Sequence, residues 1–151
     1  MKKEMNNKGF SLVELIIVVA IMAVLIGVLA PTYLKYVESS KKTSDCSAIG
    51  SIMDAVEVIA VDPTIDTWTA GTTGFEATWT AGTAVYSSTV ASEVEAIAAA
   101  EKAGLKSSWA KENFAISATK QNDGTVLFDI TGSIDKTAFA DSSKALEARF
   151  D

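Results

Sequence analysis

The sequence predicts an α+β protein in which a long N-terminal α-helix packs on a small antiparallel β-sheet domain, the head. Three observations support this class. An unbroken apolar run lies near the N-terminus, an amphipathic pattern with helical spacing follows it, and apolar and polar residues alternate near residues 114–130. At 151 residues, the chain has room for about one domain.

The apolar run extends from Phe10 to Ala30 and predicts a membrane-spanning helix over residues 10–34. Its 21 residues would span about 31 Å as a helix, close to the roughly 30 Å of bilayer hydrocarbon. Backbone groups in lipid must be satisfied internally, so a single span has to be helical. Lysines lie on both sides of the run, so the distribution of positive charge does not decide its orientation.

Glu14 is the one carboxylate inside this run. A charge at mid-bilayer costs roughly 3 kcal/mol or more. One interpretation places Glu14 near the membrane interface, where it favours the positive end of the helix dipole. The other is that it pairs with a cation once the helix leaves lipid and is surrounded by protein.

A secretory signal peptide is a rival interpretation of the same region. Val28-Leu29-Ala30 resembles the small-residue cleavage pattern that follows an apolar core. Pro31 would follow that cut directly, in a poor position for a peptidase that needs a hydrogen-bonding substrate backbone. An uncleaved membrane anchor is a further alternative.

The apolar run is followed by residues 35–62, which predict an amphipathic continuation of the helix. Apolar residues recur at spacings of three and four, while Asp45, Asp54 and Glu57 lie largely off this stripe. The stripe comprises Cys46, Ile49, Ile52, Met53, Val56, Ile59 and Ala60. Asp62-Pro63 predicts the end of the helix, which would be about 80 Å long from Phe10. Cys46 is expected to be a small buried apolar residue, with an intersubunit crosslink as the alternative.

Residues 63–151 are expected to form the head, which opens with a repeat. The hexapeptide Thr-Trp-Thr-Ala-Gly-Thr occurs at 67–72 and again at 78–83. Threonine and tryptophan favour strands and glycine favours turns, so a hairpin or ordered loop is one interpretation. The alternative is an exposed contact surface that bears tryptophan.

Three further elements are predicted in the head. Ser92 and Glu95 have the spacing of a capping box that would open a short helix ending near Gly104. Alternation over 114–118 and 126–130, with Asn-Asp-Gly between, predicts a β-hairpin. Residues 141–150 predict a helix capped by Asp141 or Ser142.

Composition excludes several functions. There is no histidine and only one cysteine, so histidine-based catalytic triads, histidine-ligated metals and internal disulfides are absent. The net charge of −6 argues against nucleic acid as the main partner. Nine acidic residues and no basic one lie between Lys42 and Lys102, which predicts a solvated surface; a cation site is the weaker alternative. No catalytic residue, cofactor or metal is predicted, and the protein is not expected to be an enzyme.

The N-terminal segment resembles the leader and first helix of type IV pilins and pseudopilins. The resemblance covers roughly residues 1–36 and rests on Lys8-Gly9-Phe10-Ser11-Leu12-Val13-Glu14, the apolar run and Pro31. It implies a leader at residues 1–9, cleaved between Gly9 and Phe10 by a prepilin peptidase, and N-methylation of Phe10. It further implies that Glu14 pairs with the Phe10 amine of a neighbouring subunit during polymerisation.

Partners and location also follow from the resemblance. The partners would be other pilin copies, the prepilin peptidase, a membrane platform protein and an assembly ATPase. The subunit would lie in the cytoplasmic membrane before assembly and in an extracellular filament afterwards. Many pilins have a glycine about eight residues before the proline, where this chain has Ala23. Gly27 and Pro31 are the predicted positions of a helix break.

Three alternative functions remain open at this point. The chain could be a pseudopilin of a type II secretion or competence system. It could be a monomeric membrane-anchored binding protein that uses the tryptophan repeat as its ligand surface. A membrane-anchored enzyme with serine-lysine or carboxylate-pair chemistry is the third. The sequence does not distinguish motility, adhesion, aggregation and DNA uptake, nor a major from a minor subunit.

Overall fold

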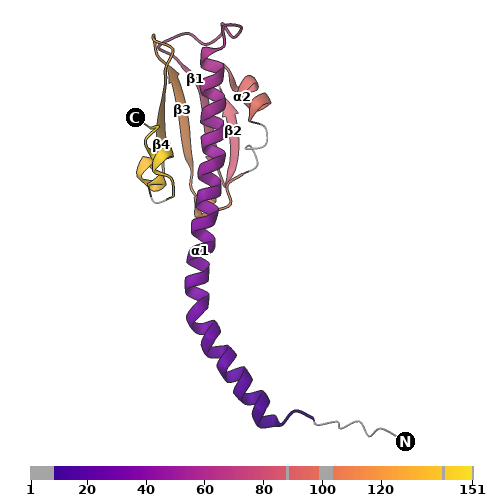
Figure 1. The fold of residues 1–151 in the computed structure, drawn as a ribbon. Coiled ribbons are helices and arrows are strands. Elements are labelled where there is room, and N and C mark those ends of the chain that lie inside the picture. Colours follow the sequence, from indigo (N-terminus) through magenta and orange to yellow (C-terminus); the bar gives the residue numbers. More distant parts are fainter. Residues whose placement is uncertain (1–8, 88, 99–103, 141, 151) are drawn as a thin grey trace, which may run out of the picture. The chain divides into compact units, whose positions relative to one another are not determined.

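The computed structural model describes residues 9–87, 89–98, 104–140 and 142–150 (Figure 1). They form two compact units, one ending at Val37 and one starting at Glu38. The first unit consists of the non-helical residues 9–11 and the first part of α1 (Leu12–Val61). The second unit contains the rest of α1 and every strand described below, and we call it the head unit.

The helix α1 begins and ends within two residues of the predicted Phe10–Asp62. At its C-terminal end, the Asp62 carboxylate accepts hydrogen bonds from the Thr64 backbone amide at 2.8 Å and the Thr64 hydroxyl at 2.6 Å. This turn and Pro63 direct the chain away from the helix, as Asp62-Pro63 predicts.

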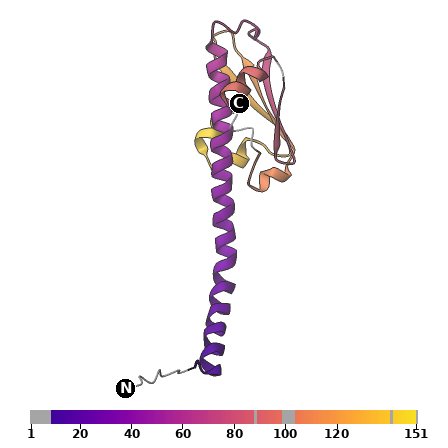
Figure 2. The same ribbon diagram turned by 90° about the vertical axis from the view of Figure 1, so that its right-hand side faces the viewer.

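The head unit contains a four-stranded antiparallel sheet in the order β2-β1-β3-β4. Its strands are β1 (Thr73–Thr80), β2 (Thr83–Ser87), β3 (Phe114–Lys120) and β4 (Val126–Gly132). The predicted hairpin over 114–130 is confirmed as β3 and β4, paired from Lys120 opposite Val126 to Phe114 opposite Gly132. Figure 2 shows α1 covering one face of the sheet, so this unit has two layers.

The buried face of α1 is the predicted apolar stripe. All seven of its residues are buried, Cys46 included, and they join one core with the inward side chains of the sheet. Trp79 of β1 stacks on Phe114 of β3 with ring centroids 4.9 Å apart. Loss of solvation raises the pKa of the Cys46 thiol to about 11, so this thiol stays protonated and is no crosslinking nucleophile.

The two copies of the hexapeptide adopt different structures. The copy at 78–83 ends β1 and starts β2, and its Ala81-Gly82 pair has φ of 50° and 76°, as a tight hairpin turn requires. The copy at 67–72 is a loop whose Trp68 indole donates to the Thr72 carbonyl at 2.9 Å. Trp68 and Trp79 are 4% and 2% exposed, so the alternative of an exposed tryptophan surface is wrong.

Two predicted helices are shorter than expected, and their caps differ. α2 (Ala91–Ile97) follows Val90 as N-cap, and Ser92 instead donates to the neighbouring Glu93 carboxylate at 2.8 Å. α2 starts one residue before the predicted cap Ser92, and Val90 and Val94 are both fully buried at its start. Residues 99–103 of the predicted helix lie outside the described residues.

The C-terminal prediction also needs correction. α3 (Lys144–Glu147) is capped by Ser143, whose hydroxyl accepts from the Leu146 amide. Ser142 is therefore not the cap, and Asp141 lies outside the described residues. Two 3-10 helices, η2 (Ser108–Lys111) and η3 (Lys136–Phe139), were not predicted, since one turn leaves little periodicity to detect.

Arg149 attaches the C-terminal segment to α1. Its guanidinium lies 2.7 Å from an Asp54 oxygen and 2.8 Å from a Glu57 oxygen, and it donates to the Gly50 carbonyl at 3.3 Å. The same group lies 5.5 Å from the centroid of the Phe128 ring. These contacts fasten the C-terminal segment where the chain has no disulfide.

Two carboxylates of α1 bind backbone amides just before and at the start of η2. Asp45, buried despite its predicted position off the apolar stripe, accepts from the backbone amides of Lys106 and Ser107 at 2.9–3.1 Å. Glu38 accepts from the Ser108 amide at 2.6 Å. Three consecutive amides thus find their acceptors on the helix.

Acidification is expected to weaken this attachment. The Ser108 amide bond holds the pKa of Glu38 below its ordinary value of 4.5. A carboxyl whose pKa is lowered by folding contributes stability that is complete above its unfolded pKa and is lost as the pH falls through the folded value. The pKa values of Asp62, Asp123 and Asp135 are also lowered, by hydrogen bonds from nearby threonine hydroxyls, and act in the same direction.

Thermal unfolding of the full chain in detergent micelles, from neutral pH down to about pH 3, measures this effect. Stability should fall in acid, and Glu38→Gln should lose less stability on acidification than the wild type. Equal losses in the two proteins would contradict a role for Glu38.

Candidate assembly site at the start of the N-terminal helix

The predicted cleavage site lies just before α1. Gly9, Phe10 and Ser11 are non-helical and exposed, and Phe10 is 85% exposed. A Cβ placed on Gly9 would meet no atom within 4 Å. The packing of the described residues therefore does not require a glycine at position 9.

Glu14 lies in the first turn of α1. Its Oε2 accepts a hydrogen bond from the Ser11 backbone amide at 2.9 Å. The spacing of Ser11 and Glu14 is that of a capping box, in which the acidic side chain reaches back to an amide at the helix start. We did not predict this contact, although the Ser-x-x-Glu spacing signals it.

The local contact leaves part of the carboxylate's capacity unused. A carboxylate accepts hydrogen bonds through two oxygens, and the Ser11 amide contacts one of them. Glu14 could therefore accept a second donor without losing its bond to Ser11. The described structure thus accommodates both sequence-based interpretations of Glu14, the helix-end carboxylate and the partner of a cation.

The apolar surface around Glu14 is exposed on all sides of the helix. Large apolar side chains from Leu12 to Leu34 are 45–73% exposed. Among the described residues, α1 is the one helix long and apolar enough to cross a membrane, and none of its most apolar stretch is buried within the chain. An apolar surface of this extent indicates contact with lipid or with other protein.

Gly27 and Pro31 lie four residues apart within α1, which is continuous through both. Proline has no amide hydrogen, so Pro31 leaves the carbonyl of residue 27, four residues earlier, without its usual helical donor. The two predicted break positions thus share one missing hydrogen bond. The described chain tolerates this defect, and unwinding at this place remains a prediction.

No metal-binding group is apparent in the described part of the chain. There, no three or more acidic or cysteine side chains gather closely enough to hold an ion. The buried tryptophans also remove the surface that a monomeric binding protein was expected to use. The candidate site is therefore the segment from Gly9 to Pro31.

A family match falls on the same N-terminal segment. Residues 5–30 match the family described as the prokaryotic N-terminal methylation motif. Over 56 residues, the chain is 38% identical to the type IV major fimbrial protein FimA of Dichelobacter nodosus, in three variants. That match covers 37% of this chain and 35–36% of each variant, so the chain spans about a third of the length of these relatives. No solved structure matches the chain significantly.

The fold agrees with the same relationship. A long N-terminal helix and a small antiparallel four-stranded sheet form a pilin-like α+β arrangement. The chain carries the prokaryotic N-terminal methylation motif in residues 5–30, and its predicted resemblance to type IV pilins is confirmed.

Proposed function

We propose that this protein is the structural subunit of a type IV pilus. It is cleaved after Gly9, N-methylated on Phe10 and polymerised into an extracellular filament. The observation that carries the proposal is the combination of an exposed Gly9 and Phe10, Glu14, and a helix whose apolar N-terminal surface is left uncovered by the described residues. The FimA relatives are described as major fimbrial proteins, which supports the same role.

The exposed helix has two successive environments in this proposal. Before assembly, residues 10–34 span the cytoplasmic membrane, where lipid covers the apolar side chains. After assembly, the same side chains pack against the helices of other copies in the filament core. Residues 35–62 support the head formed by residues 63–151.

Glu14 guides the transfer between these environments. Cleavage after Gly9 creates a charged amine on Phe10, four residues before Glu14. Each charge is costly to bury alone, whereas a pair in contact is tolerated in a medium of low dielectric constant. A Phe10 amine from a neighbouring subunit supplies the cation for Glu14 and sets the axial position of one helix against the next.

The subunit needs outside machinery for these steps. A prepilin peptidase cuts and methylates the chain, and a platform protein with an assembly ATPase supplies the work of extraction from the membrane. The chain itself has no catalytic role in this scheme. Unwinding near Gly27 and Pro31 belongs to the assembled state, where neighbouring helices can satisfy freed backbone groups.

The cleavage step is tested by substituting Gly9. Gly9→Val should leave the chain folded, because a Cβ added at Gly9 would meet no described atom within 4 Å, yet it should block cleavage by crowding the enzyme. Gly27→Val is the matched control, since Gly27 also has open space around it and lies outside the cut. Mass spectrometry of membrane fractions should find the uncleaved precursor with Gly9→Val and the mature chain with Gly27→Val. Normal cleavage of Gly9→Val would contradict the assigned site.

Electron microscopy of fibres sheared from the cell surface tests the function as a whole. Antibody to the head should label the fibres along their length. Cells that make the protein but yield no labelled fibres under any growth condition would contradict the proposed function.

A further inference from the structure

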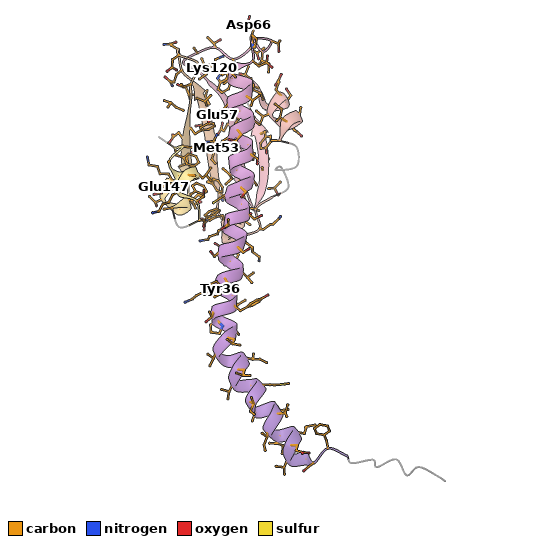
Figure 3. The ribbon with its side chains drawn as sticks, viewed as in Figure 1. Tyr36, Met53, Glu57, Asp66, Lys120 and Glu147 are labelled. Atoms are coloured by element: carbon orange, nitrogen blue, oxygen red, sulfur yellow. The ribbon has the colours of Figure 1, made fainter. Side chains whose placement is uncertain are left out.

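The head unit has an uneven distribution of charge between its two ends. We define the apex as the last two turns of α1, the loop 62–72, the start of β1 through Phe75, α2 and the β3–β4 turn with the adjoining Lys120. The Gly71 amide donates to the Lys120 carbonyl at 2.7 Å, and the Val90 amide donates to the Gly74 carbonyl at 3.1 Å, so these segments lie together. Figure 3 shows Asp66 and Lys120 at this end.

The opposite end, the base, is where α1 enters the unit. Among the described residues, it comprises the start of α1 in this unit, the turn between β1 and β2, and residues 104–113, 133–140 and 142–147. The Leu105 amide donates to the Gly82 carbonyl at 2.8 Å, and the Ser133 amide donates to the Asn113 carbonyl at 2.9 Å. Asp45 and Glu38 connect α1 to the same end.

Among the described residues, the apex carries seven carboxylates and a single lysine, and Arg149 of the C-terminal segment is paired with two of these carboxylates. The carboxylates are Asp54 and Glu57, both paired with Arg149, together with Asp62, Asp66, Glu93, Glu95 and Asp123, and the lysine is Lys120. The base carries six of the seven described lysines of this unit: Lys41, Lys42, Lys106, Lys111, Lys136 and Lys144. It also has five carboxylates, of which Asp45 is buried and Glu38 is bound by a backbone amide.

This segregation has a cost that solubility does not explain. Like charges gathered at one end repel one another and destabilise the compact state. A soluble surface needs net charge, and it is best served by both signs mixed together. A surface with separated charges is useful when it meets a surface of opposite sign, because charge complementarity selects the partner and fixes its orientation.

We propose that the acidic apex of one head docks on the lysine-rich base of another copy of this chain. The base, with six lysines against five carboxylates, is the more basic end of the same molecule, so a second copy offers the apex lysine side chains of opposite charge. A contact between two different faces of identical subunits can propagate from copy to copy, and it builds an open helical polymer when the rotation between neighbours does not close a ring. The inference rests on the proposed function, because it assigns the contact made by the heads in that filament.

Single charge reversals at the two ends test this contact in cells making the full chain. Lys111→Glu at the base and Asp66→Lys at the apex change exposed side chains. Each should lower the yield of sheared filaments about tenfold, because like charges then face each other across the contact. The double variant Lys111→Glu/Asp66→Lys restores opposite signs and should recover most of the yield.

Lys120→Glu is the matched control. It makes the same lysine-to-glutamate change at the apex, where the proposed contact already places acidic groups. Its filament yield should equal or exceed that of the wild type. Wild-type filaments should also fragment more readily as the salt concentration rises. The Debye length, about 8 Å at physiological ionic strength, becomes shorter as salt is added, so the attraction between the two ends weakens.

The outcomes separate this contact from the proposed function. Normal yields from both Lys111→Glu and Asp66→Lys would overturn the apex-to-base contact, even while filaments still form. An equal loss with Lys120→Glu, or no recovery in the double variant, would overturn it as well. Mass spectrometry of each variant should show an intact, cleaved chain, so a failure of processing is recognised separately.

Discussion

Replacing Glu14 by leucine is expected to abolish filaments while the chain is still cleaved and its head unit still folds. The carboxylate would no longer neutralise the Phe10 amine of a neighbouring subunit, so that amine would be buried without a partner. Breaking a buried ion pair in this way costs about 3–5 kcal/mol. That is more than a hundredfold in each subunit addition.

The head unit should not respond to this change. The one hydrogen bond that Glu14 makes in the described structure joins it to the Ser11 amide in the first turn of α1. Its loss frays a helix end at a cost of about 0.5–2 kcal/mol, and no core residue is involved.

Filament yield, chain mass and thermal unfolding should be measured on the same variants. Glu14→Gln is the control for shape, since it keeps the size and removes the charge, and it should fail almost as completely as Glu14→Leu. Filaments at wild-type levels from Glu14→Gln would show that charge pairing at this position is unnecessary.

Replacing Asp45 by alanine is expected to destabilise the head unit by about 3 kcal/mol. The Asp45 carboxylate is 3% exposed and is the acceptor for the amides of Lys106 and Ser107. Each buried amide that loses its acceptor costs roughly 1–3 kcal/mol. The segment before η2 would then lose its attachment to α1.

Asp54→Asn is the control for this second prediction. Asp54 also lies on α1 and pairs with Arg149, but its side chain is 71% exposed. An exposed ion pair contributes only about 0–1 kcal/mol, so its loss should lower the unfolding temperature slightly. Chemical or thermal unfolding of the full chain in micelles gives both values. Equal effects at the two positions would contradict the role assigned to Asp45.

Local sequence patterns predicted the elements in which the spacing of apolar residues matches the side chains that are buried. The α1 stripe from Cys46 to Ala60 follows from helical spacing, and the β3–β4 hairpin follows from alternation around Asn122-Asp123-Gly124. In both elements, the periodicity of the sequence matches the burial of the side chains, so one pattern carries the information.

The failures arise where tertiary contacts outweigh local pattern. Its position off the apolar stripe predicts that Asp45 faces solvent. It is buried instead, because backbone amides 61 and 62 residues away donate hydrogen bonds to its carboxylate. The two identical hexapeptides differ because Gly74 leaves room for the Trp68 ring: a Cβ there would lie 2.2–2.3 Å from indole atoms. Nothing within the hexapeptide distinguishes the two copies.

The residues of the candidate assembly site are neighbours in the sequence, whereas those of the head are not. Gly9, Phe10 and Glu14 form a linear motif, so their proximity is fixed by the sequence itself. The capping contact of Glu14 with Ser11 is also local and could have been predicted from their spacing. The charge separation in the head could not have been predicted, because it depends on how distant segments meet at each end.

The most direct test of this account is the mass and N-terminal sequence of the chain recovered from purified surface filaments. The account predicts a polypeptide that begins at Phe10, with one additional methyl group on its terminal nitrogen. Recovery of filaments whose subunits retain residues 1–9, or begin after Ala30, would contradict it.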